Sequence, residues 1–380
     1  MNAWATPSRW LHAASLVAAI MFAPLVVHAA EPIVIGESLP MGGADDGSSA
    51  RTVAGAEAYI ELVNAAGGVR GRPIKLITLD DGGDPKRHAD NLRRLAQENN
   101  AVAFINCLGD ASCAAAADMA RQVRIPLVGP LSGAQGLSRA ANPYVFRIRA
   151  PYLREAEALA KQLLAVGTLS VAIVTDSRTP SEPVQSVQEA LGRSKIKSTV
   201  MVVDPNSEAS FKKLMTGLGA SRFQAVFLDI HADTFSQLGE LKLEKRDEWP
   251  LVLTTFASGN SNSFLNAFSN RMLGSTSVVP NPELAAIPLA RELQQQAERS
   301  SGGSALTYAG MESYINTRVC VEAMRRVEGN KVDAHSVLAA LNALGTLDVG
   351  GFILTFSPGA PSASDWVDIV VRSRTGYLLK

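Results

Sequence analysis

Short apolar runs alternate along the chain with segments in which apolar residues recur every three or four positions. The first pattern is typical of buried strands, and the second is typical of helices with one buried face. Because the strands are mostly continuous apolar runs separated by helical segments, we expect parallel sheets covered by helices on both faces. The strands predicted in this way are 33–35, 74–79, 101–106, 125–128, 171–174, 225–229 and 251–256.

Residue type marks two helix boundaries. The helical pattern that carries Val53 and Val63 stops at Gly67 and Gly68, and glycine is the usual residue just past a helix end. Asp84 followed by Pro85 is a typical N-cap and first helical residue. These signals predict one helix before the strand at 74–79 and another after it.

A strand-like stretch at 144–149 divides the chain, because a loop rich in Ser, Gly and Asn precedes it and a new series of strand–helix units follows. Further crossings are expected at 277–282 and 351–356. We therefore predict two α/β lobes, each a doubly wound parallel sheet, joined by three crossover strands with a cleft between them. The predicted lobes are 31–150 with 281–351 and 151–280 with 352–380. Loops at the carboxyl ends of the strands should line the cleft, since open α/β sheets bind ligands there.

Residues 1–30 have the composition of a secretory signal peptide. Arg9 precedes an uncharged apolar stretch at 11–27, and Ala29 and Ala30 are small residues suited to cleavage. A membrane anchor is the alternative, but Pro24 interrupts a segment already shorter than the ~20 residues that a span needs. We expect an exported, soluble mature chain, most simply located in a bacterial periplasm.

Charge and motifs exclude several classes of function. The 36 Lys and Arg residues balance 36 Asp and Glu residues without a basic block, so a nucleic-acid binder is disfavoured. The five histidines do not cluster and the three cysteines form no CxxC, which argues against a metal site. No GxSxG, HExxH or Walker motif is present, so we expect neither an enzyme nor a cofactor.

An oxidising compartment permits disulfides. Cys107 and Cys113 are six positions apart and could form a bridge if the segment between them turns. Two reduced, packed thiols are the alternative, and the sequence leaves both open. Cys320 lies in a long helical pattern and is expected to be a buried apolar residue.

Four segments in order resemble a known family. They are Asn64-Ala-Ala-Gly-Gly-Val-Arg-Gly-Arg-Pro-Ile-Lys-Leu at 64–76, Ile-Pro-Leu-Val-Gly-Pro at 125–130, the helix-like 308–323, and Gly-Gly-Phe-Ile-Leu-Thr-Phe-Ser-Pro at 350–358. From about 33 to 372 the chain is similar to the periplasmic substrate-binding proteins of ABC transporters, in the branched-chain amino-acid (Leu/Ile/Val-binding) group.

The resemblance implies a type I periplasmic-binding fold whose hinge closes around a small ligand. It also implies delivery of that ligand to an ABC permease in the inner membrane, without catalysis and without nucleic acid; we expect a monomer. A second function remains open: a periplasmic sensor of the same fold that hands its bound state to a membrane receptor or kinase.

The resemblance also assigns candidate ligand-binding positions. Those in the predicted first lobe follow two of its strands, and those in the second lobe follow three of its strands. The candidates are Asp110, Ala111, Ser112, Ser132, Gly133, Asp176, His231 and Phe256.

Two of these residues do not suit an α-amino acid. A buried ligand ammonium needs a charged partner, and Phe256 stands where the family has a glutamate. Asp110 falls near the ligand carboxylate and would repel it unless protonated. Either Asp110 serves as the ammonium partner of a reoriented ligand, or the ligand is not a standard α-amino acid but an aromatic or other small organic acid or amide. We favour the second interpretation.

Each candidate also has a purely structural interpretation. Asp110 and Asp176 could cap the helices that follow them, and an N-cap side chain stabilises a helix by roughly 0.5–2 kcal/mol. Ser132 could be a turn residue, His231 a surface residue and Phe256 a core residue.

Overall fold

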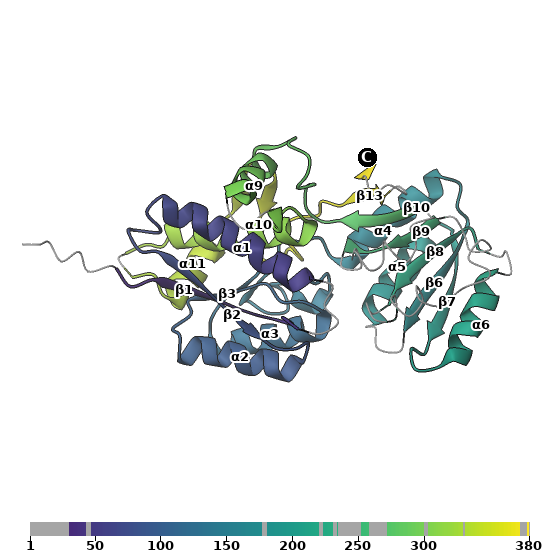
Figure 1. Ribbon diagram of the computed structural model, residues 1–380, viewed down its shortest axis with the longest axis horizontal. Coiled ribbons are helices and arrows are strands. Elements are labelled where there is room, and N and C mark those ends of the chain that lie inside the picture. The colour runs from purple at the N-terminus through teal and green to yellow at the C-terminus, as the bar shows by residue number, and fades with distance from the viewer. Residues whose placement is uncertain are drawn as a thin grey trace, which may run out of the picture.

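The structure, a computed structural model, places two lobes beside each other along the longest axis of the molecule (Figure 1). It describes residues 30–42, 47–176, 181–219, 223–230, 234, 252–257, 272–299, 303–329, 331–372 and 378–379. The expected signal peptide lies outside this part of the chain except for Ala30. Among the described helices, none combines the length and the apolar character that a membrane crossing requires.

Lobe 1 is built on a sheet of strand order β2-β1-β3-β4-β5, and every described pairing in it is parallel. This confirms the predicted parallel sheet. Its elements are β1 (Ile33–Leu39), α1 (Ser48–Ala65), β2 (Ile74–Asp80), α2 (Pro85–Gln97), β3 (Ala103–Ile105), α3 (Asp110–Val123), β4 (Leu127–Val128), the 3-10 helix η1 (Gln135–Leu137), β5 (Val145–Phe146), α9 (Pro288–Arg299), α10 (Tyr308–Arg325), α11 (Ala334–Asn342), β11 (Thr346–Asp348) and β12 (Ile353–Thr355).

Lobe 2 is built on a second sheet, of strand order β14-β13-β10-β9-β8-β6-β7. The pairings of β10 with β13 and of β13 with β14 are antiparallel, so this sheet is mixed rather than purely parallel. Its elements are α4 (Tyr152–Ala165), β6 (Ser170–Asp176), α5 (Ser181–Arg193), β7 (Lys197–Val203), α6 (Glu208–Gly219), β8 (Ala225–Asp229), β9 (Val252–Thr255), β10 (Met272–Ser277), β13 (Asp368–Arg372) and β14 (Leu378–Leu379).

Local sequence explains two helix boundaries as predicted. The backbone leaves α1 through Gly67 and Gly68, whose φ angles of 97° and 74° lie in the left-handed region that glycine adopts readily. Asp84 caps α2, because its side chain accepts a hydrogen bond of 2.8 Å from the Arg87 amide. Both signals depend on neighbouring residues alone, which is why the sequence reveals them.

Apolar cores fill both faces of each sheet. In lobe 1, α2 and α3 pack on one face with Leu95 and Phe104, while α1 and α10 pack on the other with Tyr59 and Tyr314. In lobe 2, α4 and α5 share one core and α6 lies in another. The doubly wound arrangement that the apolar runs predict is therefore present in both lobes.

The chain crosses between the lobes at three places. The first crossing follows β5 and ends where α4 begins, and the second follows β10, after which Val278 and Val279 enter the core of lobe 1. The third crossing lies between Ser364 and Asp368, so the boundary predicted at 351–356 is wrong.

The physical reason for this correction is a local hairpin. Gly350 and Gly351, with φ angles of 103° and 87°, help to turn the chain so that β12 pairs antiparallel with β11. Leu354 and Phe356 then pack in the core of lobe 1. Residues 352–364 therefore belong to lobe 1, and only the segment from β13 onward completes lobe 2.

Candidate ligand-binding site

A cavity of about 460 Å³ lies between the lobes, and residues of both lobes and of the crossings line it. Lobe 1 contributes the start of α1, the turn before α3 and the start of α10. Lobe 2 contributes the carboxyl ends of β8 and β9. The polar or charged residues on its wall are Ser48, Arg51, Asp110, Arg149, Tyr152, Asp229, Thr255, Thr276, Ser277, Asn281, Glu283, Thr307, Tyr308 and Glu312.

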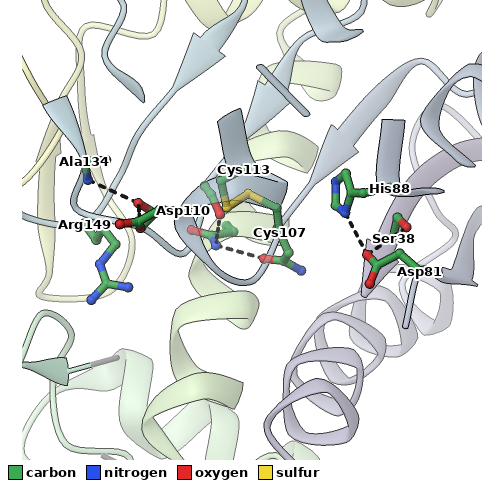
Figure 2. The surroundings of a disulfide bond; sticks show 12 residues. Ser38, Asp81, His88, Cys107, Asp110, Cys113, Ala134 and Arg149 are labelled. Atoms are coloured by element: carbon green, nitrogen blue, oxygen red, sulfur yellow. Dashed lines mark hydrogen bonds and ion pairs between the residues drawn. A yellow bond between two sulfur atoms is a disulfide. The ribbon is translucent and has the colours of Figure 1, made fainter. Parts of the chain in front are cut away.

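A disulfide fixes the turn that carries Asp110. Cys107, just after β3, is bonded to Cys113 in the first turns of α3, with 5.3 Å between the Cα atoms (Figure 2). Gly109 is the N-cap of α3, and its φ angle of 81° suits glycine. Asp110 is therefore the first residue of the helix, and its side chain does not cap it.

The Asp110 carboxylate is held by two hydroxyl groups. Ser132 Oγ and Tyr152 OH each donate a hydrogen bond of 2.6 Å to Asp110 Oδ1. Burial and the neighbouring Asp110 carboxylate raise the pKa of Tyr152, so this phenol stays a donor. Both bonds end on the same oxygen of Asp110, a residue that lines the cavity.

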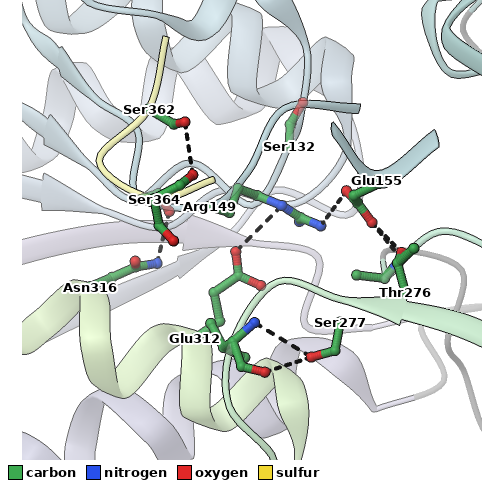
Figure 3. A network of polar contacts seen from close by, with 12 residues as sticks. Ser132, Arg149, Glu155, Thr276, Ser277, Glu312, Asn316, Ser362 and Ser364 are labelled. Atoms are coloured by element: carbon green, nitrogen blue, oxygen red, sulfur yellow. Dashed lines mark hydrogen bonds and ion pairs between the residues drawn. The ribbon is translucent and has the colours of Figure 1, made fainter. Parts of the chain in front are cut away.

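Arg149 forms a buried charge network in the first crossing, with its side chain 2% exposed (Figure 3). Its guanidinium lies 3.4 Å from Glu155 Oε1 and 3.6 Å from Glu312 Oε1. Burial alone would lower the pKa of Arg149, but Glu312 and Glu155 outweigh it and the net shift is upward. Arg149 therefore stays charged and is already paired with two carboxylates.

Glu155 and Glu312 connect Arg149 to opposite lobes. Glu155 stands on α4, where its Oε2 accepts hydrogen bonds from the Ala257 amide, at 2.9 Å, and from Thr276 Oγ1. Glu312 stands on α10, and burial raises the pKa of its carboxyl although Arg149 lowers it in part. The network thus ties the first crossing to α4 and β10 of lobe 2 and to α10 of lobe 1.

Asp229 is the last residue of β8 and brings a carboxylate to the cavity from lobe 2. Burial, followed by repulsion from Asp110 and Asp176, raises the pKa of Asp229 to about 7. Its Oδ2 is shielded from solvent and accepts no hydrogen bond from the part of the chain that the structure describes.

The structure brings some of the predicted residues to the site and leaves others behind it. Asp110 lines the cavity, and the Ser132 hydroxyl donates a hydrogen bond to its carboxylate. Gly133 packs against Tyr152, where an added Cβ would come within 2.7 Å of the Tyr152 amide nitrogen. Ala111 and Ser112 lie further along α3, outside the wall of the cavity.

The candidates predicted in the second lobe do not line the cavity where the structure describes them. Asp176 is buried behind the wall, where Thr234 Oγ1 donates to its Oδ2 at 2.8 Å. Phe256 is 2% exposed and stacks on Tyr152, with 5.4 Å between the ring centroids, so it is a core residue and does not line the cavity. His231 lies outside the described residues.

Sequence reasoning misses Arg149, Tyr152, Asp229 and Glu312. Two of them carry a usable signal: Arg149 is a charged residue inside a predicted crossing strand, and Asp229 ends a predicted strand at the edge where ligands bind. Glu312 lies on the largely buried helix α10 and Tyr152 begins α4, and no local sequence pattern distinguishes either residue. Among the described residues, no group of three or more His, Cys, Asp or Glu side chains is arranged to hold a metal ion.

Comparison with known proteins agrees with this architecture. The model of a family described as periplasmic binding protein matches residues 32–364. A substrate-binding periplasmic protein from Ralstonia solanacearum is 25% identical, with a TM-score of 0.80 over 91% of this chain and 99% of that one. A leucine-binding protein from Thermotoga maritima, 15% identical, shares the fold with a TM-score of 0.78 over 91% of this chain and 97% of that one.

One curated relative is an amino acid binding protein from Pseudomonas aeruginosa, 25% identical over 205 residues. The match spans 53% of this chain and 55% of that relative's length. The proteins found are thus named for binding, and two of these names specify an amino acid.

Proposed function

Since the chain belongs to the periplasmic binding protein family, we propose that it captures a small molecule between its lobes in the periplasm and delivers it to an ABC permease. The observation that carries this proposal is the cavity of about 460 Å³ whose wall is shared by both lobes. A site divided between two bodies suits capture by closure.

The proposed motion is a hinge at the three crossings. The third crossing starts beside the first, since the Ala363 and Ser364 amides donate to the Arg147 and Ile148 carbonyls at 2.9 and 3.0 Å. Direct contacts between lobes occur near the first crossing: Tyr152 on α4 bonds to Asp110, and the Gln135 amide donates to Glu182 at 2.6 Å. A ligand that touches both lobes would favour the closed form by its difference in affinity between the two forms.

We propose that the ligand is not a standard α-amino acid, because of the charge of the cavity wall rather than because of Phe256. Phe256 gives no support for an aromatic ligand, because it stacks in the core beneath the site. The charge of the wall now matters more, since Asp110 and Asp229 both face the cavity.

The first prediction is that a bound ligand compacts the protein. A thermal-shift screen over amines, amides, amino acids, aromatic acids and dicarboxylates should find compounds that raise the melting temperature, because ligand binds only the folded state. The same compounds should decrease the radius of gyration in solution scattering. A ligand that stabilises the chain without compaction would contradict the hinge.

Delivery to a permease needs a separate measurement in cells. Deleting the gene should reduce uptake of the radiolabelled ligand, and supplying the gene again should restore it. Unchanged uptake together with a lost transcriptional response to the ligand would point instead to the sensor function. Mass spectrometry of the compound that co-purifies with the protein supplies the ligand for both experiments.

A further inference from the structure

We propose that the ligand carries a positively charged group, which Asp110 of lobe 1 and Asp229 of lobe 2 hold between them. In this arrangement the site recognises an amine and does not require a ligand carboxylate. The inference rests on the proposed function, because it assigns the chemistry of the molecule that the two lobes enclose.

Asp110 is prepared to accept a donor from the ligand. Its Oδ1 already receives the hydroxyl protons of Ser132 and Tyr152, each at 2.6 Å. These two bonds orient the carboxylate of a residue that lines the cavity, and no bond from a described residue to Oδ2 accompanies them. A fixed carboxylate with one uncommitted oxygen suits an ammonium group, which donates charge-assisted hydrogen bonds.

One oxygen of the Asp229 carboxylate lacks a hydrogen-bond donor among the described residues. Its Oδ2 is shielded from solvent, and no donor among the described residues reaches it. Leaving a buried carboxylate oxygen without a donor is costly, and the cost is larger when two other carboxylates lie nearby. Asp110 and Asp176 are those neighbours. Asp229 also lines the cavity, so a cation bound there would relieve the repulsion among these carboxylates.

One of the two arginines on the wall does not offset these carboxylates. Arg149 is committed to Glu155 and Glu312 at 3.4 and 3.6 Å. Arg51 lies at the start of α1, close enough to Gly47 that an added Cβ there would be 3.4 Å from Arg51 Nη2. The wall thus carries carboxylates from both lobes, while one of its two arginines is already neutralised.

The N-terminus of α3 is a position where an anion would normally be stabilised. Here Asp110 is the first helical residue, so the protein's own carboxylate takes that favourable position. An anionic ligand group would have to approach Asp110 directly. This geometry disfavours acids at the same place where it favours amines.

The two carboxylates also connect charge with closure. Asp110 and Asp229 belong to different lobes and repel each other, since the charge of Asp110 raises the pKa of Asp229. A neutral or anionic compound leaves this repulsion in place, whereas a cation between them replaces it with two attractions. A cationic ligand therefore gains more affinity in the closed form than in the open form, which is the condition for ligand-driven closure.

The test compares compounds of one shape and different charge. Leucine, 3-methylbutylamine, which lacks the carboxylate, and 4-methylpentanoate, which lacks the ammonium, are titrated into the full mature protein by calorimetry near neutral pH. Phenylalanine, phenethylamine and 3-phenylpropanoate form a second series. In each series the amine should bind at least tenfold more tightly than the acid.

Single substitutions then assign the effect to the two carboxylates. Asp110→Asn and Asp229→Asn should each weaken binding of the amine by roughly tenfold to a hundredfold, because each removes one charge-assisted hydrogen bond. Asp118→Asn is the matched control: it lies on the same helix α3, but its side chain is 65% exposed and paired with Arg121. It should leave binding unchanged. Melting curves check that each variant is folded.

Tighter binding of the acids than of the amines would overturn the inference, as would unaltered amine binding in both folded variants. Failure of both amines to bind at millimolar concentration would overturn it too. If an acid or an amino acid binds and compacts the protein, the proposed capture function stands and only the charge assignment fails. If the co-purified compound and every probe leave the radius of gyration unchanged, the capture function itself fails.

Discussion

At the scale of single residues, the surroundings of Asp229 disfavour its ionised form. Burial and the nearby Asp110 and Asp176 raise its pKa from 3.8 to about 7. The folded chain therefore holds this proton more tightly than the unfolded chain does. Ionising Asp229 costs folding free energy, and the cost accumulates as pH rises from the unfolded pKa to the folded one.

The pH dependence of stability follows from this sign. Asp229→Asn should gain stability relative to the wild type as pH rises from about 4 to about 7, by roughly 1–4 kcal/mol, and the gain should level off above that range. Urea unfolding of both proteins at several pH values, without ligand, measures the difference. A difference that stays constant from acid to neutral pH would show that the Asp229 pKa is not raised.

At the scale of elements, the β3–α3 turn positions Asp110 through a covalent bond. The disulfide between Cys107 and Cys113 encloses Gly109 and Asp110. It connects the end of a central strand with the first turns of the helix. The helix start, and with it the Asp110 carboxylate, is therefore fixed relative to the sheet.

Removing this bond should cost stability and affinity together. The double variant Cys107→Ser, Cys113→Ser should unfold with a free energy lower by about 2 kcal/mol, as expected for a short closed loop. It should also bind ligand more weakly, because Asp110 loses its fixed position. The matched control is reductant: it should lower the melting temperature of the wild type and leave that of the double variant unchanged.

The same scale shows what sequence can and cannot predict. Apolar runs and the Asp84–Pro85 pair identify elements correctly, because their signal is contained in neighbouring residues. The sequence places the third crossing too early. Gly350 and Gly351 indicate a turn, but they do not indicate that β12 pairs with β11. The sequence does not reveal the roles of Arg149 and Glu312, because these depend on a contact between residues 163 positions apart.

At the scale of the whole molecule, Arg149 joins parts that the fold otherwise separates. Its partner Glu155 lies on α4 of lobe 2, and its partner Glu312 lies on α10 of lobe 1. Both partners are buried, so water screens the attraction between these charges only weakly. The first crossing is therefore coupled electrostatically to both lobes.

Arg149→Met should uncouple the lobes. The substitution leaves Glu155 and Glu312 buried without their cation, which should cost about 3–5 kcal/mol. We expect a lower melting temperature and a calorimetric transition that broadens or splits in two. Arg154→Met is the control, since its side chain is 49% exposed and its ion pair with Glu157 lies on the surface. It should change stability by no more than about 1 kcal/mol. A single sharp transition of unchanged midpoint in Arg149→Met would contradict the coupling.

The position of β13 has a consequence for how the chain acquires its structure. This strand lies between β14 and β10, so the sheet of lobe 2 incorporates a segment that begins at Asp368. Lobe 1 likewise takes α9, α10 and α11 from beyond residue 287. A nascent polypeptide that ends before these segments can finish neither half. The sheet of lobe 2 and the core of lobe 1 are therefore completed only after these late segments have been synthesised.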